Sequence, residues 1–470
     1  MSACQGPRGL MFRAFLILPG LACLLSEPVW AQPVGADRDS SFDRNEVNQN
    51  GAGRVMRPAD RRPVRNEALA ESLGIHKYVS RRLVLFTDLD PAVARTLPPL
   101  IDQAYVAWTD YFGELPPEPG GADFQITGYL MVDERRFIEA GLEPAGFVMA
   151  KFGRQVGREF WMHDQHSDYY RRHLLIHEST HAFMTVMPRV LPPLWYLEGM
   201  AELFGTHVLD PNGQVTFGVM PDAPEDFQGL GRIELIQQEN YFGRERDLHH
   251  LGSLTPNDFI TPRPVPYAWS WAVCYFLDHH PRYQARFRRL GRNLEGPEFQ
   301  RLLAELFTPE QRLLSAEWHD FTRRLEYGYQ VEHSAFVPAS VTQRNPITPV
   351  TVQVTSQAGW QQTGMVVDAS QSVEVQASGS VVLDPGPPEW ASEPNGITVN
   401  YAGGFPLGTL LLGWLPEEGD AVLQVSAVGP GKTVTLPGPG TIWLRINDTG
   451  SNLGNNTGSY KVTLSCLPSP

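Results

Sequence analysis

The sequence is poor in cysteine, with four in 470 residues. Cys4 and Cys23 lie within the first 31 residues, which leaves Cys274 and Cys466 for the rest of the chain. A scaffold built on disulfides is therefore excluded. We expect two buried thiols, and a single bond between them stays an alternative if their domains touch.

Positive charge is also scarce. Lys and Arg number 38 against 52 Asp and Glu, so the net charge is -14. Nucleic acids and anionic membranes are normally bound by basic surfaces, so we expect neither as a partner. No run after residue 31 is long and apolar enough to span a membrane. With 42% hydrophobic and 19% charged residues, the chain is expected to be globular and to form two or three domains.

The amino terminus has the pattern of an export signal. Arg8 and Arg13 precede the apolar run "AFLILPGLACLL", and "VWA" places small residues before a cut after Ala31. Residues 1–31 are thus predicted to be a signal peptide, and the mature protein to be secreted or periplasmic. Residues 32–75 are polar, without an apolar period, which indicates a disordered leader or a propeptide.

Composition divides the remainder into two domains. Residues 76–334 mix strand-like runs such as "RRLVLFTDLD" with helical spacing, which predicts an α+β domain. A Pro- and Thr-rich linker, 335–349, follows. Residues 350–470 are rich in Gly, Val, Thr and Ser and alternate with period two, as in "VEVQA" and "YKVTL", which predicts an all-β sandwich.

The segment 167–187, "SDYYRRHLLIHESTHAFMTVM", contains an HExxH motif within a predicted helix. His177 and His181 are four residues apart, so their imidazoles project from one helical face, which suits a shared Zn²⁺. Glu178 lies beside them and is the candidate general base. A polar stripe of helical residues is the structural alternative.

A catalytic zinc needs a third protein ligand and one open position. The next segment, "PPLWYLEGMAELFGTH" (192–207), predicts a second helix that carries Glu198 and Glu202 on one face. Packed antiparallel to the first helix, it would bring Glu198 to the metal. Glu202 would accept the ring N–H of a ligating His, or lie on a solvated face.

"HESTH" followed by "PLWYLEGMAELF" resembles the gluzincin metallopeptidases, the clan of thermolysin and the aminopeptidase N group. The larger domain is most similar to a poorly characterised set of secreted bacterial proteins in that clan. The resemblance implies a zincin-like fold, zinc bound by His177, His181 and Glu198, and Glu178 as general base. The gap from His181 to Glu198 is slightly shorter than in the two named groups, so Glu202 remains the alternative ligand.

Other polar and aromatic residues fit less specific roles. Tyr267, Trp271 and Tyr275 form an i, i+4, i+8 stripe that is typical of a core, although a tyrosine such as Tyr267 stabilises an oxyanion in some related peptidases. The remaining histidine clusters lack a partnered motif and are expected at the surface or as helix caps. They are His163 and His166, His249 and His250, and His279 and His280.

The segment 446–462, "INDTGSNLGNNTGSYKV", places oxygen donors between two predicted strands. Asp448, Asn452, Asn455 and Asn456 offer carboxylate, amide and carbonyl oxygens, which suit Ca²⁺ better than Zn²⁺. Three glycines, at 450, 454 and 458, are expected to allow tight curvature. A glycine-rich hairpin with a polar tip is the alternative.

The pattern N-D-(x)₆-N-N-T-G-S is similar to the calcium-dependent galactophilic lectins of the PA-IL type. The resemblance implies calcium bound by the side chains of Asp448, Asn455 and Asn456 and by the carbonyls of Asn452 and Leu383. It also implies sugar contacts from Asp448, Asn455 and, in "SEPNG", Asn395. No histidine occupies that last segment, which puts galactose specificity in doubt.

Together these patterns predict a multi-domain chain: a zincin-like metallopeptidase domain followed by a lectin-like sandwich. The expected function is a secreted zinc-dependent endo- or aminopeptidase that acts on protein or peptide and is tethered to carbohydrate through calcium. The rival is a carbohydrate-binding protein whose peptidase-like domain is inactive.

Overall fold

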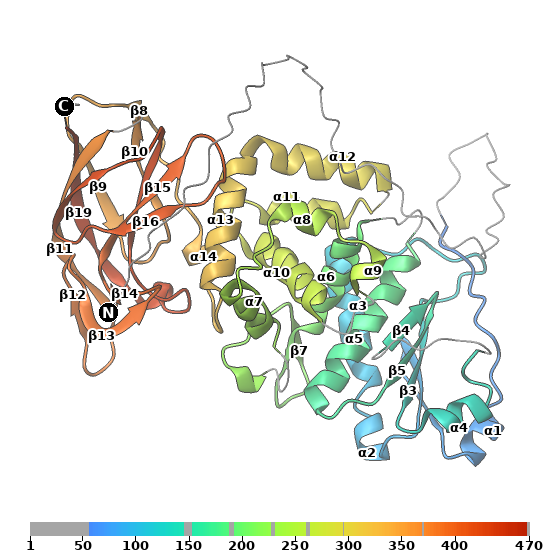
Figure 1. Ribbon diagram of the computed structural model, residues 1–470. Helices are drawn as coiled ribbons and strands as arrows, with labels where there is room; N and C mark the ends of the chain where they lie inside the picture. Colours follow the sequence, from blue (N-terminus) through green and yellow to red (C-terminus); the bar gives the residue numbers. More distant parts are fainter. Residues whose placement is uncertain are drawn as a thin grey trace, which may run out of the picture. The chain divides into compact units, whose positions relative to one another are not determined.

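The computed structural model describes residues 56–144, 153–187, 192–226, 231–259, 264–294, 296–368 and 371–467 (Figure 1). The predicted signal peptide, the cut after Ala31 and residues 32–55 of the predicted leader lie outside these residues. The described chain has a mixed α/β amino-terminal region and a β-rich carboxyl-terminal region with several sheets.

The first region is built around a five-stranded sheet in the order β1-β2-β3-β5-β4. Its strands are β1 (His76–Val79), β2 (Leu83–Thr87), β3 (Ile126–Met131), β5 (Glu159–His163) and β4 (Gly153–Val156). The neighbours β2, β3 and β5 run parallel, whereas β1 and β4 pair antiparallel at the two edges. A short hairpin joins β6 (His207–Leu209) to β7 (Val215–Phe217).

Helices make up most of the rest of this region. They are α1 (Glu67–Ser72), α2 (Pro91–Ala94), α3 (Pro98–Phe112), α4 (Glu134–Glu139), α5 (Asp168–Thr185), α6 (Leu194–Gly205), α7 (Arg232–Tyr241), α8 (Leu248–Gly252), α9 (Pro256–Phe259), α10 (Val265–His279), α11 (Gln284–Gly291), α12 (Gly296–Phe307), α13 (Gln311–Arg324) and α14 (Val331–Ser334). The central helix is α10, because "VPYAWSWAVCYFLD" is buried at nearly every position.

Alternating side chains of β2 divide the core between the two faces of the sheet. Leu83 and Leu85 join the large cluster that contains α3, α5, α6 and α10. Phe86 joins a smaller cluster with Tyr129 and Trp161 on the other face, beside α1 and α4. A sheet covered on both faces explains why its parallel strands are continuous apolar runs.

Residues 56–75 are folded, so the prediction of a disordered leader is wrong for this part of the chain, and the alternative of a propeptide stays a prediction. Arginines fix the segment to the first region. Arg57 donates to Glu118 at 3.1 Å, and Arg65 contacts Glu159 at 2.9 Å. Glu118 also binds Arg158 at 2.9 Å, so one buried carboxylate neutralises two buried guanidinium groups. We call residues 56–66 the strap. Its polar residues, whose sequence pattern is typical of disorder, hold it to the first region.

The second region contains two larger sheets, in the orders β16-β15-β18-β10-β8 and β12-β11-β19-β9, with β17 paired to β11. The strands are β8 (Gln343–Arg344), β9 (Val350–Thr355), β10 (Gln361–Val367), β11 (Ser372–Asp384), β12 (Trp390–Ser392), β13 (Ile397–Ala402), β14 (Phe405–Leu407), β15 (Leu410–Pro416), β16 (Gln424–Ala427), β17 (Gly431–Thr435), β18 (Gly440–Ile446) and β19 (Thr457–Cys466). The period-two side chains of β11, β18 and β19 meet in one buried cluster.

The predicted linker is held by the second region rather than free. Within 335–349, β8 pairs parallel with β10, and Val337 forms a bridge with Gln361. Cys274 and Cys466 are both free cysteines, and Cys274 is buried. None of the helices in the described residues is long and apolar enough to cross a membrane.

Candidate metal centre

The HExxH segment lies in α5, and local sequence explains where this helix begins. The side chain of Ser167 accepts a hydrogen bond from the backbone N–H of Tyr170, and Asp168 supplies a negative charge in the first turn. Helix α6 begins directly after the proline pair 192–193 and packs against α5. These two helices bring the predicted ligands together.

The three predicted zinc ligands form a compact triangle. Nε2 of His181 lies 3.1 Å from Nε2 of His177 and 3.2 Å from Oε2 of Glu198. The third side, from His177 Nε2 to the same oxygen, is 3.5 Å. Ligands about 2.1 Å from a tetrahedral zinc lie about 3.4 Å apart, so the donor set and its spacing both fit zinc.

Glu198 approaches the histidines because α6 packs closely on α10. A Cβ at Gly199 would overlap the carbonyl of Ser270 and lie 2.5 Å from Sγ of Cys274. The glycine that follows the ligand therefore permits the helix contact that positions α6. Burial alone raises the pKa of Glu198, but His181 and His177 outweigh it and lower that pKa to about 2.

Glu202 lies behind the triangle, one helical turn after Glu198. Its Oε1 is 3.3 Å from Nδ1 of His177, and its Oε2 is 3.2 Å from Nε2 of His173. Arg232 of α7 binds both carboxylate oxygens, at 2.7 and 2.8 Å. His173, His177 and Glu202 also have metal-binding spacing. Since the guanidinium already neutralises Glu202, the triangle with Glu198 is the better cation site.

Glu178 is buried beside β4. A Cβ at Gly153 would lie 2.5 Å from Oε1 of Glu178, so this carboxylate packs directly on the backbone of the edge strand. Desolvation raises the pKa of Glu178, partly opposed by the nearby His177 and His181. A carboxylate whose pKa is raised binds and releases a proton nearer to neutral pH than an exposed one.

Tyr267 lies at the start of α10 and faces the same site. Its ring centroid is 6.3 Å from that of His177, and Phe259 packs edge-on against it at 5.1 Å. Burial raises its pKa, with a further contribution from Glu198. Trp271 and Tyr275 belong to the core cluster, as the stripe predicts.

The sequence did not single out His173, Arg232 or Gly153. His173 was detectable, because it precedes His177 by four residues on the same helix. Arg232 lies 30 residues after Glu202 on another helix, and nothing in its local sequence marks it. Among the other histidines, His280 is buried and lies 3.0 Å from Glu317 rather than at the surface.

The second region places two predicted calcium ligands, Asp448 and Asn456, against each other. Oδ1 of Asp448 accepts from the backbone N–H of Thr449, and Oδ2 accepts from Nδ2 of Asn456 at 2.9 Å. Oδ1 of Asn456 is buried without a hydrogen-bond partner in the described residues, so an acceptor remains for a cation. β11 pairs Val382 with Thr457, and Leu383 and Asn456 are the next residues beyond that pair on the two chain segments. These oxygens fit Ca²⁺.

Exposure separates the predicted sugar contacts. Asp448 is 1% exposed, whereas the other two predicted contacts, Asn455 and Asn395, are exposed. The carbonyl of Asn395 accepts from Oγ1 of Thr409 at 3.4 Å, and the carbonyl of Thr409 accepts from the N–H of Asn447. The "SEPNG" segment thus lies near the start of the loop that holds Asp448.

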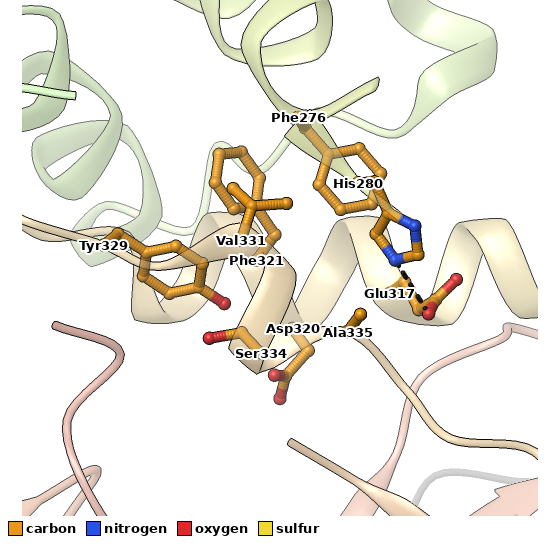
Figure 2. Close-up of a pocket in the computed structure, with 9 residues that line it drawn as sticks. All are labelled: Phe276, His280, Glu317, Asp320, Phe321, Tyr329, Val331, Ser334 and Ala335. Carbon is orange, nitrogen blue, oxygen red and sulfur yellow. Dashed lines mark hydrogen bonds and ion pairs between the residues drawn. The ribbon is translucent and has the colours of Figure 1, made fainter. Parts of the chain in front are cut away.

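A cavity of about 10 Å³, roughly the room that one water needs, lies apart from these ligands. Figure 2 shows its lining, which includes His280, Glu317, Asp320 and Tyr329 and none of the predicted zinc or calcium ligands.

No family model matches this chain, and no curated protein matches it. Solved structures give weak likenesses. One is the N-terminal domain of EclA, described as a PllA-like lectin, with 18% identity over 25% of this chain and 95% of that chain, at a TM-score of 0.21. Another is PliG of Aeromonas hydrophila, a periplasmic inhibitor of g-type lysozyme, with 11% identity over 28% and 96% of the two chains, at a TM-score of 0.16.

Proposed function

We propose that the first region is an exported zinc-dependent peptidase with a zincin-like fold and gluzincin ligand order. The triangle of His177, His181 and Glu198 carries the proposal, because three donors at tetrahedral spacing leave a fourth position open. Structural zinc sites are closed by four protein ligands, whereas this site offers three, which supports a catalytic role. Glu178 beside the triangle adds a carboxylate that can act as a general base.

Each side chain of the site has a separate proposed role in amide hydrolysis. Zinc, when bound, would lower the pKa of a water toward about 7 and polarise the substrate carbonyl. The carboxylate of Glu178 would accept the proton from the water and pass it to the departing amine. Glu202 would hold the ring of His177 through Nδ1, and Tyr267 would be placed to donate to the developing oxyanion.

The position of β4 supports an extended peptide as substrate. β4 is an edge strand of the described sheet, and its first residue, Gly153, lies against Glu178. Extended peptides add to sheet edges through main-chain hydrogen bonds, which bind many sequences alike. A peptide paired with β4 would pass beside the general base.

Metal content and hydrolysis, measured together on the full chain, test this proposal. We expect about one zinc per chain in both the wild type and Glu178→Gln, because Glu178 is not a ligand. Hydrolysis of a fluorescently labelled protein mixture should fall at least about 100-fold in Glu178→Gln. A matched control is Glu139→Gln, at the end of α4, which should retain wild-type activity.

Wild-type hydrolysis by a zinc-loaded Glu178→Gln variant would contradict the proposal. A wild-type chain that holds zinc and hydrolyses no peptide would instead favour the rival, a carbohydrate-binding protein with an inactive peptidase-like domain.

We propose in addition that the second region binds calcium and, through it, carbohydrate. The buried carboxylate of Asp448 and the unpartnered Oδ1 of Asn456 support the cation site, and the exposed Asn455 supports contact with a sugar. Calcium would anchor the enzyme at glycans and so raise the local substrate concentration.

Binding to a glycan array with and without calcium tests this second part. Asn455→Ala should abolish calcium-dependent retention, whereas Asn400→Ala, an exposed asparagine of β13, should not. The absence of wild-type binding to every glycan in the presence of calcium would contradict a sugar-binding role.

A further inference from the structure

The loop that connects β18 to β19, residues 447–456, contacts the first region through its own backbone. The N–H of Gln330 donates to the carbonyl of Gly450 at 3.0 Å. In return, the N–H of Gly454 donates to Oε1 of Gln330 at 2.8 Å. Ser451 donates its N–H to Oε1 of Glu326 at 2.9 Å. The contacts fall between Asp448 and Asn455, in the middle of the predicted calcium loop.

This contact accounts for two of the loop's glycines. Of Gly450, Gly454 and Gly458, only Gly458 has a positive φ, at +92°. A Cβ at Gly450 would overlap the ring of Tyr329. A Cβ at Gly454 would lie 2.9 Å from Oε1 of Gln330. Close approach to a buried ring, and not backbone curvature, is therefore what Gly450 requires, which corrects the interpretation from sequence. At Gly454 the near atom is the end of the Gln330 side chain, which can move, so that requirement is weaker.

A buried arginine makes a second connection beneath the loop. Arg445 of β18 is 0% exposed, lies 3.4 Å from Asp320 of α13, and donates to the carbonyl of Asp448 at 3.2 Å. Asp320 also accepts from the indole N–H of Trp360 in the second region. Asp320 and Tyr329 both line the small cavity of Figure 2. The contact of Arg445 with Asp320 and the contact of the loop with Gln330, next to Tyr329, are therefore close together in the first region.

Apolar packing makes the junction continuous. Ala316 of α13 belongs to one buried cluster with Trp360, Leu411 and Trp443 of the second region. The loop is thus bound at its base by Arg445, in its middle by Gln330, and is adjacent to a packed apolar contact.

We propose that docking on residues 326–330 preorganises the 447–456 loop for calcium, and that calcium in turn stabilises the junction between the two regions. The inference rests on the proposed calcium binding. Hydrogen bonds to Gly450, Ser451 and Gly454 fix the backbone between the ligands before the cation arrives, which removes part of the ordering cost of binding. Because coupling between two sites is reciprocal, calcium stabilises the docked state by the same factor.

Calcium affinity of the full chain, measured by chelator competition at fixed zinc, tests the coupling. Gln330→Ala removes the side-chain oxygen that accepts from the N–H of Gly454, keeps the backbone bond to Gly450 and touches no predicted ligand. We expect its calcium dissociation constant to rise about fivefold, as for the loss of one hydrogen bond. Gln311→Ala, an exposed glutamine at the start of α13, is the matched control and should bind as the wild type does.

Hydrogen exchange gives a readout on the folded wild type alone. Calcium should slow exchange at the amide of Gln330 and leave the amides of β3 unchanged. Equal calcium affinity in Gln330→Ala and wild type, or no calcium effect on Gln330 exchange, overturns the coupling and leaves calcium binding intact. A wild type that binds no calcium overturns the proposed cation site together with the coupling.

Discussion

Nδ1 of His177 lies 3.3 Å from Oε1 of Glu202, on the side of the imidazole that faces away from the metal triangle. The same ring presents Nε2 to Glu198. This is an ion-pair distance and not a formed hydrogen bond. When a metal binds at Nε2, a carboxylate at this distance from Nδ1 can fix the ring orientation and the tautomer. The two glutamates of α6 therefore have separate predicted roles, which substitution can distinguish.

Glu198→Ala should abolish zinc binding, whereas Glu202→Gln should weaken it by about 10- to 100-fold, because the first removes a ligand and the second only loosens one. Zinc dissociation constants measured by competition with a fluorescent chelator check this order. Equal losses in the two variants would show that Glu202 is itself a ligand, the alternative that the short spacing left open.

Arg232→Met should destabilise the zinc-free protein by about 3 kcal/mol, because it leaves the buried carboxylate of Glu202 without its bidentate partner. In the double variant Arg232→Met/Glu202→Met, much of that loss should be recovered, since both charges are removed. Urea unfolding of the two single variants and the double variant measures the interaction. Additive losses would mean that the pair is not coupled.

Gly153→Ala should reduce hydrolysis without reducing zinc content. The new methyl group would lie 2.5 Å from Oε1 of Glu178 and displace the carboxylate from its place against β4. Val156→Ala, at the other end of the same strand, is the control for a general effect on the edge. Unchanged turnover in Gly153→Ala would show that Glu178 does not need this packing.

Glu118→Gln should destabilise the protein by about 3 kcal/mol at pH 7, because it removes the carboxylate that Arg57 and Arg158 share and leaves Arg158 only the more distant Asp60, at 3.6 Å. Burial raises the pKa of Glu118, but the hydrogen bonds from Asp60 and Arg158 outweigh it, so the folded-state pKa lies below the ordinary 4.5. Its stabilising effect is thus present above pH 4.5 and lost as the pH falls through the folded-state value.

The difference in melting temperature between wild type and Glu118→Gln should therefore shrink as the pH falls below 4.5. Asp123→Asn, in an exposed pair with Arg81, should change stability little at either pH. If the difference in melting temperature stayed constant with pH, the stabilising effect of Glu118 would not depend on its negative charge, which would contradict this prediction.

Much of this arrangement could be predicted from periodic patterns. The spacing of His177 and His181 required a helix, and the prolines at 192–193 marked the start of the next one, so the contact with Glu198 followed from packing two adjacent elements. The apolar alternation of β11, β18 and β19 likewise identified the faces that meet in the second region.

Contacts between distant segments could not be predicted in the same way. The sequence of the strap predicts disorder because the carboxylates that pair with its arginines, Glu118 and Glu159, lie some 60 to 95 positions away. The sequence predicts local curvature at Gly450 and Gly454, because it does not show that Tyr329 and Gln330 lie against them. Sequence patterns predict the local backbone conformation. The roles of these arginines and glycines depend instead on tertiary contacts with residues far away in the sequence.

The strap also sets a limit on maturation. An export or processing peptidase that cuts ahead of Met56 removes none of the arginines that neutralise Glu118 and Glu159. A cut closer to residue 75 would strip those counter-ions and uncover the sheet face that carries Tyr129. The amino terminus of a processed chain is therefore expected upstream of Met56, because trimming into the strap would remove Arg57 and then Arg65 from the folded region.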